Sequence, residues 1–253
     1  WHQYLYLHND DTIFTNEQIL AYPFYKVPRY EKWRAFQDTI VALQDYEIWI
    51  TEYGFHDKTD DKHFANTWAH ALIHSGMNNL LIENNKVEML LHHNVGGIFP
   101  TFDALDTQNG FSKRMVGISN TIWNQQMIHA ISTTQIASTF SYADTVNYYN
   151  SNGLLLDVAY SKLFAWKFEN TQRESAIVVN ISEDTIFVDV DAVFVGENVF
   201  WKKWTTDSLY AHLDSIFQPQ ITVDTGSENI AIPPYSINVA SAEICSHATN
   251  SQE

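Results

Sequence analysis

Three short apolar strands alternate with amphipathic helical segments in the first half of the chain, and this order most constrains the fold. The expected elements are, in chain order, strand 2–8, helix 29–44, strand 47–51, a helix from about 62, strand 87–91 and a helix from about 119. Such alternation predicts parallel strands joined by helical crossovers. Each strand ends in polar residues, so polar side chains should gather at one edge of the sheet, where β/α barrels build their active sites.

The pattern changes after about residue 154, where helical spacing disappears and short runs alternate apolar with polar residues. Strands are expected at 163–168, 177–181, 186–190, 198–204, 220–224, 228–232 and 235–244. This spacing predicts an antiparallel β-sandwich. The expected fold class is therefore α/β plus all-β, with the last strands and helices of a β/α barrel over 1–150 and a sandwich over 154–245.

Composition narrows the range of partners. The formal net charge of −16 repels phosphate backbones and anionic membranes, so we expect no nucleic acid and no membrane partner. Neutral or weakly charged glycans are compatible with that charge. The single cysteine, Cys245, excludes intramolecular disulfides, which is mild evidence for a cytosolic protein. We nevertheless expect a secreted or periplasmic location, because many bacterial secreted enzymes lack disulfides.

The most informative segment is 48–55, Ile-Trp-Ile-Thr-Glu-Tyr-Gly-Phe. It places the carboxylate of Glu52 at the end of an apolar strand, where a purely structural charge would be costly. At the rim of a barrel such a carboxylate can attack an anomeric carbon or stabilise an oxocarbenium-like transition state. The structural alternative is that Glu52 caps a helix or pairs with a lysine.

Polar and aromatic residues next to the three strand ends are the further site candidates. Hydrogen bonds to sugar hydroxyls and stacking on a sugar ring are the roles expected of His8, Asn9, Tyr53, Phe55, His92 and Asn94. The alternatives are ordinary rim residues for the polar ones and plain packing for Tyr53 and Phe55. The tryptophans at helical spacing, Trp33, Trp68 and Trp123, are expected in the core.

Other motifs carry less weight. His70 and His74 have the spacing of a helical metal pair, but the glutamate of a His-Glu-x-x-His motif is absent, so we expect no metal there. No phosphate-binding loop or dinucleotide fingerprint is present, and we expect no cofactor. The sequence Asn180-Ile181-Ser182 matches a glycosylation sequon but lies in an expected strand.

The segment Trp49-Ile50-Thr51-Glu52-Tyr53-Gly54 resembles the seventh strand of clan A glycoside hydrolases, which include α-L-arabinofuranosidases, xylosidases and agarases. Residues 2–10 look like the sixth strand of that clan and 87–94 like the eighth. The strands from 154 onward, with 232–239 as the last, look like the sandwich that often follows the barrel. The resemblance implies a retaining glycoside hydrolase acting on a poly- or oligosaccharide, with Glu52 as the nucleophile.

The chain departs from the clan's pattern in two places. The acid/base glutamate of the clan ends the fourth strand, which this sequence does not contain, and a His followed closely by a Tyr often ends the sixth, where this chain has His8-Asn9-Asp10. A full barrel has eight strand–helix units, so we expect the missing N-terminal part of the barrel as a partner. The alternative function is a non-catalytic carbohydrate-binding or structural protein with the same fold.

Overall fold

The computed structural model describes residues 2–8, 13, 15–26, 35, 39, 47–60, 63–83, 86–93, 95–97, 103–108, 110, 112–136, 142–150, 152–194, 198–211 and 218–243. Most of the expected helix at 29–44, including Trp33, lies outside these residues. Within the described part, no helix combines the length and apolar character needed to cross a bilayer.

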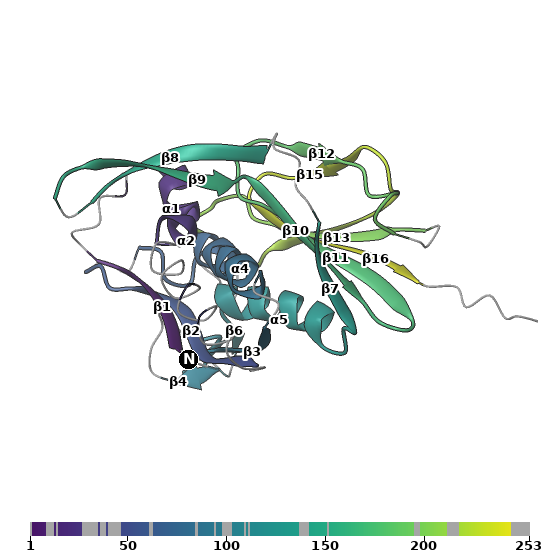
Figure 1. Cartoon of the computed structure of the whole chain (residues 1–253), viewed down its shortest axis with the longest axis horizontal. Coiled ribbons are helices and arrows are strands. Elements are labelled where there is room, and N and C mark those ends of the chain that lie inside the picture. Colours follow the sequence, from purple (N-terminus) through teal and green to yellow (C-terminus); the bar gives the residue numbers. More distant parts are fainter. Residues whose placement is uncertain are drawn as a thin grey trace, which may run out of the picture.

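The first part of the fold is a three-stranded parallel sheet (Figure 1). Its strands are, in spatial order, β1 (His2–Leu7), β2 (Ile48–Asp57) and β3 (Val87–His92). All three were expected from the sequence. Parallel neighbours need a crossover, and between β2 and β3 the helix α4 (Trp68–Ile82) provides it.

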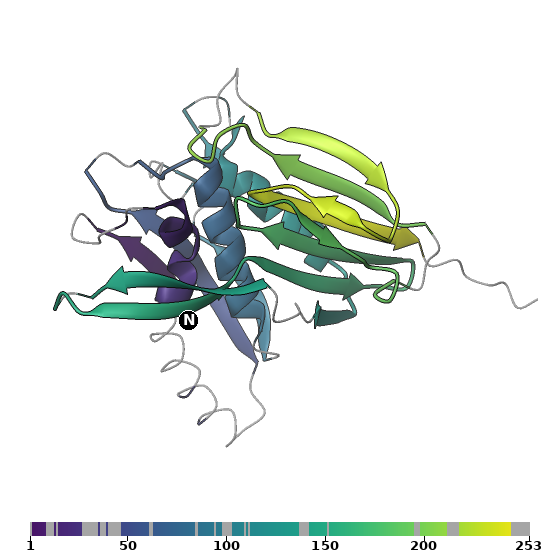
Figure 2. The ribbon, with the colours of Figure 1, turned by 90° about the horizontal axis from the view of Figure 1, so that it is seen from above.

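Helices α4 and α5 (Met115–Met127) lie between this sheet and a second one, so the molecule is built in layers (Figures 1 and 2). The core joins the layers, with Ile50 from the first sheet, Trp68 from α4 and Ile177 from the second sheet all fully buried. Trp68 and Trp123 are both in this core, as expected. The indole N–H of Trp68 donates to the carbonyl of Tyr235 at 2.6 Å, which keeps the buried nitrogen satisfied and ties the helix to the second sheet.

The second sheet has six antiparallel strands. In spatial order they are β14 (Gln220–Thr225), β13 (Phe200–Thr205), β16 (Ser236–Glu243), β11 (Arg173–Asn180), β10 (Leu163–Glu169) and β7 (Ser132–Ile136). The pair β12 (Ile186–Val188) and β15 (Ile230–Ile232) packs through its apolar residues on the face away from the helices. The strands expected after residue 154 are therefore present, with ends shifted by a few residues.

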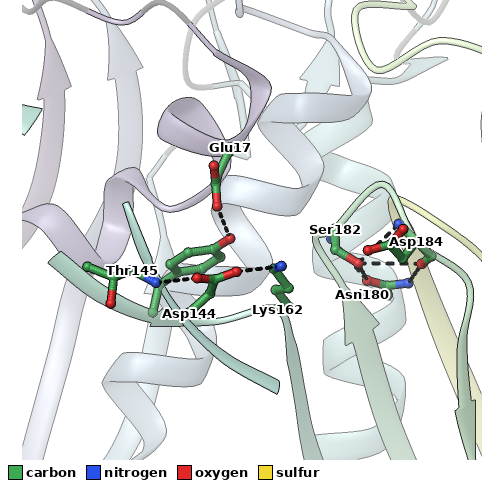
Figure 3. Close-up of polar contacts among 8 residues, drawn as sticks. Glu17, Asp144, Thr145, Lys162, Asn180, Ser182 and Asp184 are labelled. Atoms are coloured by element: carbon green, nitrogen blue, oxygen red, sulfur yellow. Dashed lines mark hydrogen bonds and ion pairs between the residues drawn. The ribbon is translucent and has the colours of Figure 1, made fainter. Parts of the chain in front are cut away.

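A long hairpin, β8 (Ala143–Tyr149) and β9 (Leu155–Ser161), was not expected from the sequence. It extends over the short helices α1 (Asn16–Leu20) and α2 (Tyr22–Tyr25). Tyr148 donates to the carbonyl of Gln18. The carboxylate of Glu17 points toward the hairpin and accepts from the hydroxyl of Tyr160 (Figure 3). The expected boundary at 150–154 falls in the turn of this hairpin, and the division into parts 1–150 and 154–245 stays a prediction.

Asn180, the first residue of the sequon, closes a turn after β11 (Figure 3). Its side chain is fully buried. The amide nitrogen donates to the carbonyls of Asp184 at 2.8 Å and Pro233 at 2.9 Å, while the amide oxygen accepts from the Ser182 backbone at 2.9 Å. In the folded chain this side chain is therefore buried and engaged in hydrogen bonds on both sides of its amide.

Candidate active site

Glu52 lies in the middle of β2 and not at its end. The sequence predicted that the strand stops at Thr51, but β2 continues to Asp57 because β1 pairs with that second half, from His2 beside Glu52 to Leu7 beside Asp57. The prediction was wrong about the end of the strand, since the backbone partner that extends it comes from a segment about fifty residues earlier in the chain.

An irregularity in β2 aims Glu52 away from the helices. Ile50 pairs with Leu90 and Tyr53 with His92, so Thr51 and Glu52 together stand opposite the single residue Leu91. This is a β-bulge, which changes the alternation of side chains along a strand. Ile50 and Tyr53 both point into the buried helical side, and Glu52 between them lies partly exposed on the open side.

Two side chains of β1 contact the Glu52 carboxylate. The hydroxyl of Tyr4 donates to Oε2, and Nδ1 of His2 lies 3.1 Å from the same oxygen. The hydrogen bond from Tyr4 lowers the pKa of Glu52, with further lowering from the nearby His2 and His93. Burial and the Glu52 charge raise the pKa of Tyr4, so its phenol keeps the donated proton. The result is a carboxylate held ionised and oriented through one oxygen.

Sequence reasoning missed His2, Tyr4 and His93. The ring of His93 meets the ring of Tyr4 edge-on, with centroids 5.6 Å apart, just beyond the end of β3. A signal for the first two was present, because His2-Gln3-Tyr4 is itself a His followed closely by a Tyr. The pair was expected at the end of the strand, where the sequence has His8-Asn9-Asp10 instead, but the residues that reach Glu52 lie at the beginning of β1.

Two expected site residues, Tyr53 and Phe55, face the wrong side for contact with a sugar at Glu52. Tyr53 and Phe55 are 3% and 0% exposed. His92 pairs with Tyr53 in the register but is only partly buried, and it lines the cavity beside Glu52 described below. Tyr53 stacks on the His74 ring at 5.2 Å, and Phe55 meets the His70 ring at 5.4 Å. Their role is core packing against α4, because alternate strand residues point to opposite faces.

The other expected site residues are less closely tied to Glu52. His8 follows the last residue of β1 and is exposed on the same side of the sheet as Tyr6, whose ring lies 6.1 Å from its own. Asn9 and Asn94 lie outside the described residues, so their expected roles remain predictions.

A cavity of about 540 Å³ opens beside Glu52, between β3, α5 and a small sheet. That sheet consists of β4 (Gly96–Gly97), β5 (Leu105–Asp106) and β6 (Ser112–Lys113). Polar lining residues include Thr51, His93, Asn120 and Asn124, which offer hydroxyl, imidazole and amide groups. Of the described residues that line the cavity, Glu52 alone is a carboxylate.

His70 and His74 are buried in the core. Nδ1 of His74 lies 3.3 Å from the Ser119 hydroxyl, which in turn lies 3.0 Å from the hydroxyl of Ser75. Burial lowers the pKa of His70 to about 3 and that of His74 well below its usual value, so both are neutral at physiological pH. Over the described ranges, no group of three or more His, Cys, Asp or Glu residues is arranged to hold a metal ion.

The sequence matches no protein-family model and no curated protein. Solved structures with a similar fold include the α-L-arabinofuranosidase from Thermotoga maritima, with a TM-score of 0.70 at 13% identity, covering 96% of this chain and 52% of that protein. A GH51 α-L-arabinofuranosidase from Thermotoga petrophila gives 0.66 at 14% identity, with 95% and 52% covered. A 4-O-α-L-rhamnosyl-β-D-glucuronidase from Fusarium oxysporum gives 0.61 at 8% identity, with 94% and 52% covered.

The chain thus shares its fold with glycoside hydrolases of the kind that its sequence resembles. It spans about half the length of each of these proteins.

Proposed function

We propose that this chain carries the nucleophile of a retaining glycoside hydrolase. The proposal starts from the fold that the chain shares with α-L-arabinofuranosidases and related glycoside hydrolases. The observation that carries the proposal is the environment of Glu52, whose carboxylate is oriented by Tyr4 and His2 on a β-bulge and opens onto a cavity. An ionised carboxylate at a cavity is what attack on an anomeric carbon requires.

In the proposed first step, the Oε1 atom of Glu52 attacks the anomeric carbon and forms a glycosyl ester. The bond from that carbon to the leaving oxygen breaks, and the leaving oxygen takes a proton from a carboxylic acid. Tyr4 occupies Oε2, which leaves Oε1 for the attack. In the second step, water attacks the anomeric carbon and gives its proton to the acid/base, and Glu52 is released as a carboxylate.

The acid/base carboxyl in a retaining enzyme lies about 5–5.5 Å from the nucleophile. Since Glu52 is the sole carboxylate among the described lining residues, we propose that the acid/base comes from a further part of the protein. The parallel strands β1 to β3 would then be three of the eight strands of a barrel, and that further part would supply the others.

A non-catalytic, carbohydrate-binding protein is the second candidate. The same observation favours it, because a cavity lined by one carboxylate can bind a sugar without cleaving it. A substrate that needs no acid catalysis distinguishes the two functions.

The experiment therefore uses 2,4-dinitrophenyl α-L-arabinofuranoside with the 253-residue chain, since dinitrophenolate leaves without a proton from the enzyme. We expect a burst of dinitrophenolate and a protein whose mass increases by one pentosyl group, located on Glu52 by peptide mapping. Glu52→Gln should remove the burst and the label, whereas Glu47→Gln, an exposed glutamate just before β2, should keep both. Labelling that survives Glu52→Gln would show that Glu52 is not the nucleophile, and no labelling with any aryl glycoside tried would leave only the binding function.

A further inference from the structure

The open face of the parallel sheet carries a second group of functional side chains beyond Glu52. The register places His2 beside Glu52, Tyr4 beside Gly54 and Tyr6 beside His56. Paired residues of parallel strands share a face, so Tyr6 and His56 point to the same side as Glu52. They lie two residues further along the strands from Tyr4, a step of roughly 7 Å.

Nitrogen-bearing side chains surround the Tyr6 ring. The Nζ atom of Lys58 lies 3.9 Å from the ring centroid, and the rings of His56 and His8 lie 5.9 and 6.1 Å away. The backbone holds this group together, because the N–H of Lys58 donates to the carbonyl of Leu7 at 2.8 Å and so continues the pairing of β1 with β2. We call Tyr6, His8, His56 and Lys58 the Tyr6 cluster.

The nearest carboxylate in the sequence, Asp57, does not point into the Tyr6 cluster. It is fully buried on the opposite face, where its oxygens accept from the backbone N–H groups of Thr59 at 3.0 Å and Phe64 at 2.9 Å. Lys58 and His8 are exposed on the open face. In a chain whose formal charge is −16, this face gathers one lysine and two imidazoles around an aromatic ring.

That combination suits an acidic sugar. A Lys ammonium offers three donors and imidazoles offer further N–H groups, and together they can bind a carboxylate. An aromatic ring packs against the C–H face of a sugar, as at many binding sites that combine apolar walls with a few polar groups. The step from Glu52 to the Tyr6 cluster is comparable to the distance between neighbouring rings in a sugar chain.

We propose that the Tyr6 cluster is a subsite for an anionic sugar, a uronic acid residue whose carboxylate binds Lys58 and the imidazoles. The inference rests on the proposed function, since it places this residue next to the sugar attached to Glu52. It narrows the substrate class from glycosides in general to those that contain a uronic acid.

Binding rather than turnover tests the subsite. Methyl β-D-glucuronide and methyl β-D-glucoside differ only in the carboxylate at C6, and isothermal titration of the 253-residue chain compares them directly. We expect the glucuronide to bind at least about tenfold more tightly at low salt and to lose most of this preference at high salt.

The variants Lys58→Met and His56→Gln should each weaken glucuronide binding several-fold without changing glucoside binding. Lys202→Met, which removes a lysine over Trp204 on β13, is the matched control and should leave both affinities unchanged. His8→Gln is the second test if Lys58→Met fails to fold, as judged by circular dichroism.

Equal binding of the two sugars would overturn the proposal, as would an unchanged preference in Lys58→Met. Inorganic sulfate competing as well as the glucuronide would also overturn it, because the cluster would then be a general anion site. Titrations are repeated in Glu52→Gln, where the preference should persist. If the glucuronide is preferred but Glu52 is never labelled by the aryl glycoside, only the proposed function is refuted. If Glu52 is labelled but the glucuronide is not preferred, only the subsite is refuted.

Discussion

Tyr4 donates its hydroxyl hydrogen to Oε2 of Glu52 from the neighbouring parallel strand, although the residue paired with Glu52 in the register is His2. Tyr4 itself pairs with Gly54, which has no side chain to occupy that face. The phenol can therefore lie back across β2 and reach the carboxylate. This contact connects the fold to the proposed chemistry, because it orients Glu52 and keeps it ionised.

The first prediction concerns the variant Tyr4→Phe. Loss of the donor removes the largest cause of the lowered Glu52 pKa, so that pKa should rise toward its usual value. The acidic limb of the pH–rate profile for release of dinitrophenolate should shift to higher pH, and the rate should fall by roughly tenfold or more. Tyr149→Phe, on the exposed hairpin, is the control. An unchanged acidic limb would show that Tyr4 does not set the charge of Glu52.

The buried histidines predict instability in acid. An unfolded histidine has a pKa of about 6.5. Burial lowers the pKa of His70 to about 3 and that of His74 well below its usual value, with His92 adding to both shifts and His56 and Arg114 to that of His70. Stability is therefore complete above about pH 6.5 and is lost as pH falls toward the folded pKa, because the unfolded chain takes up protons first.

Each of these histidines should lower the free energy of unfolding by about 2 kcal/mol at pH 5. That pH lies about 1.5 units below the unfolded pKa, and each unit corresponds to about 1.36 kcal/mol. For a chain of this size, the melting temperature should fall by about 4–8 °C per histidine between pH 7 and pH 5. His70→Gln and His74→Gln should each reduce that slope, whatever they do to stability at pH 7. His63→Gln, at an exposed position, should not. Identical slopes in all variants would contradict the prediction.

At Gly117, replacing glycine with alanine should destabilise the helix instead of stabilising it. Replacing a helical glycine with alanine normally stabilises by about 1 kcal/mol. In α5, a Cβ atom on Gly117 would lie 2.1 Å from the carbonyl oxygen of Ala104. Gly117→Ala should therefore destabilise by about 1–3 kcal/mol in urea unfolding. Gln125→Ala, exposed on the same helix, should be close to neutral, and a stabilised Gly117→Ala would show that α5 does not approach Ala104 so closely.

Replacing Asn180 should lower the stability of the fold without affecting the chemistry at Glu52. Asn180→Ala would leave the buried N–H of Ser182 without its acceptor, and a buried polar group without a partner costs about 1–3 kcal/mol. Urea unfolding should show a loss in that range, and labelling at Glu52 should be retained. Thr222→Ala, on the exposed strand β14, is the comparison, and equal stability of the two variants would argue against the role of Asn180.

Local pattern in the sequence was enough to predict most of the elements. The alternation of strands and helices before residue 154 and the period-two runs after it predicted β1 to β3, α4, α5 and the strands of the second sheet other than β7, because a backbone element depends mainly on which side chains must be buried. The same local pattern predicted that Glu52 lies on an apolar strand. The hairpin β8–β9 was missed, since its strands are largely exposed and pair only with each other.

Only the tertiary structure decided which side chains meet at Glu52. The register of β1 against β2 brought His2 and Tyr4 to the carboxylate and moved His8 to the Tyr6 cluster. The bulge at Thr51–Glu52 sent Tyr53 and Phe55 into the core although they are next to site residues in the sequence. A shift of one residue turns every later side chain to the other face of a strand, and such shifts are set by packing and pairing with distant segments.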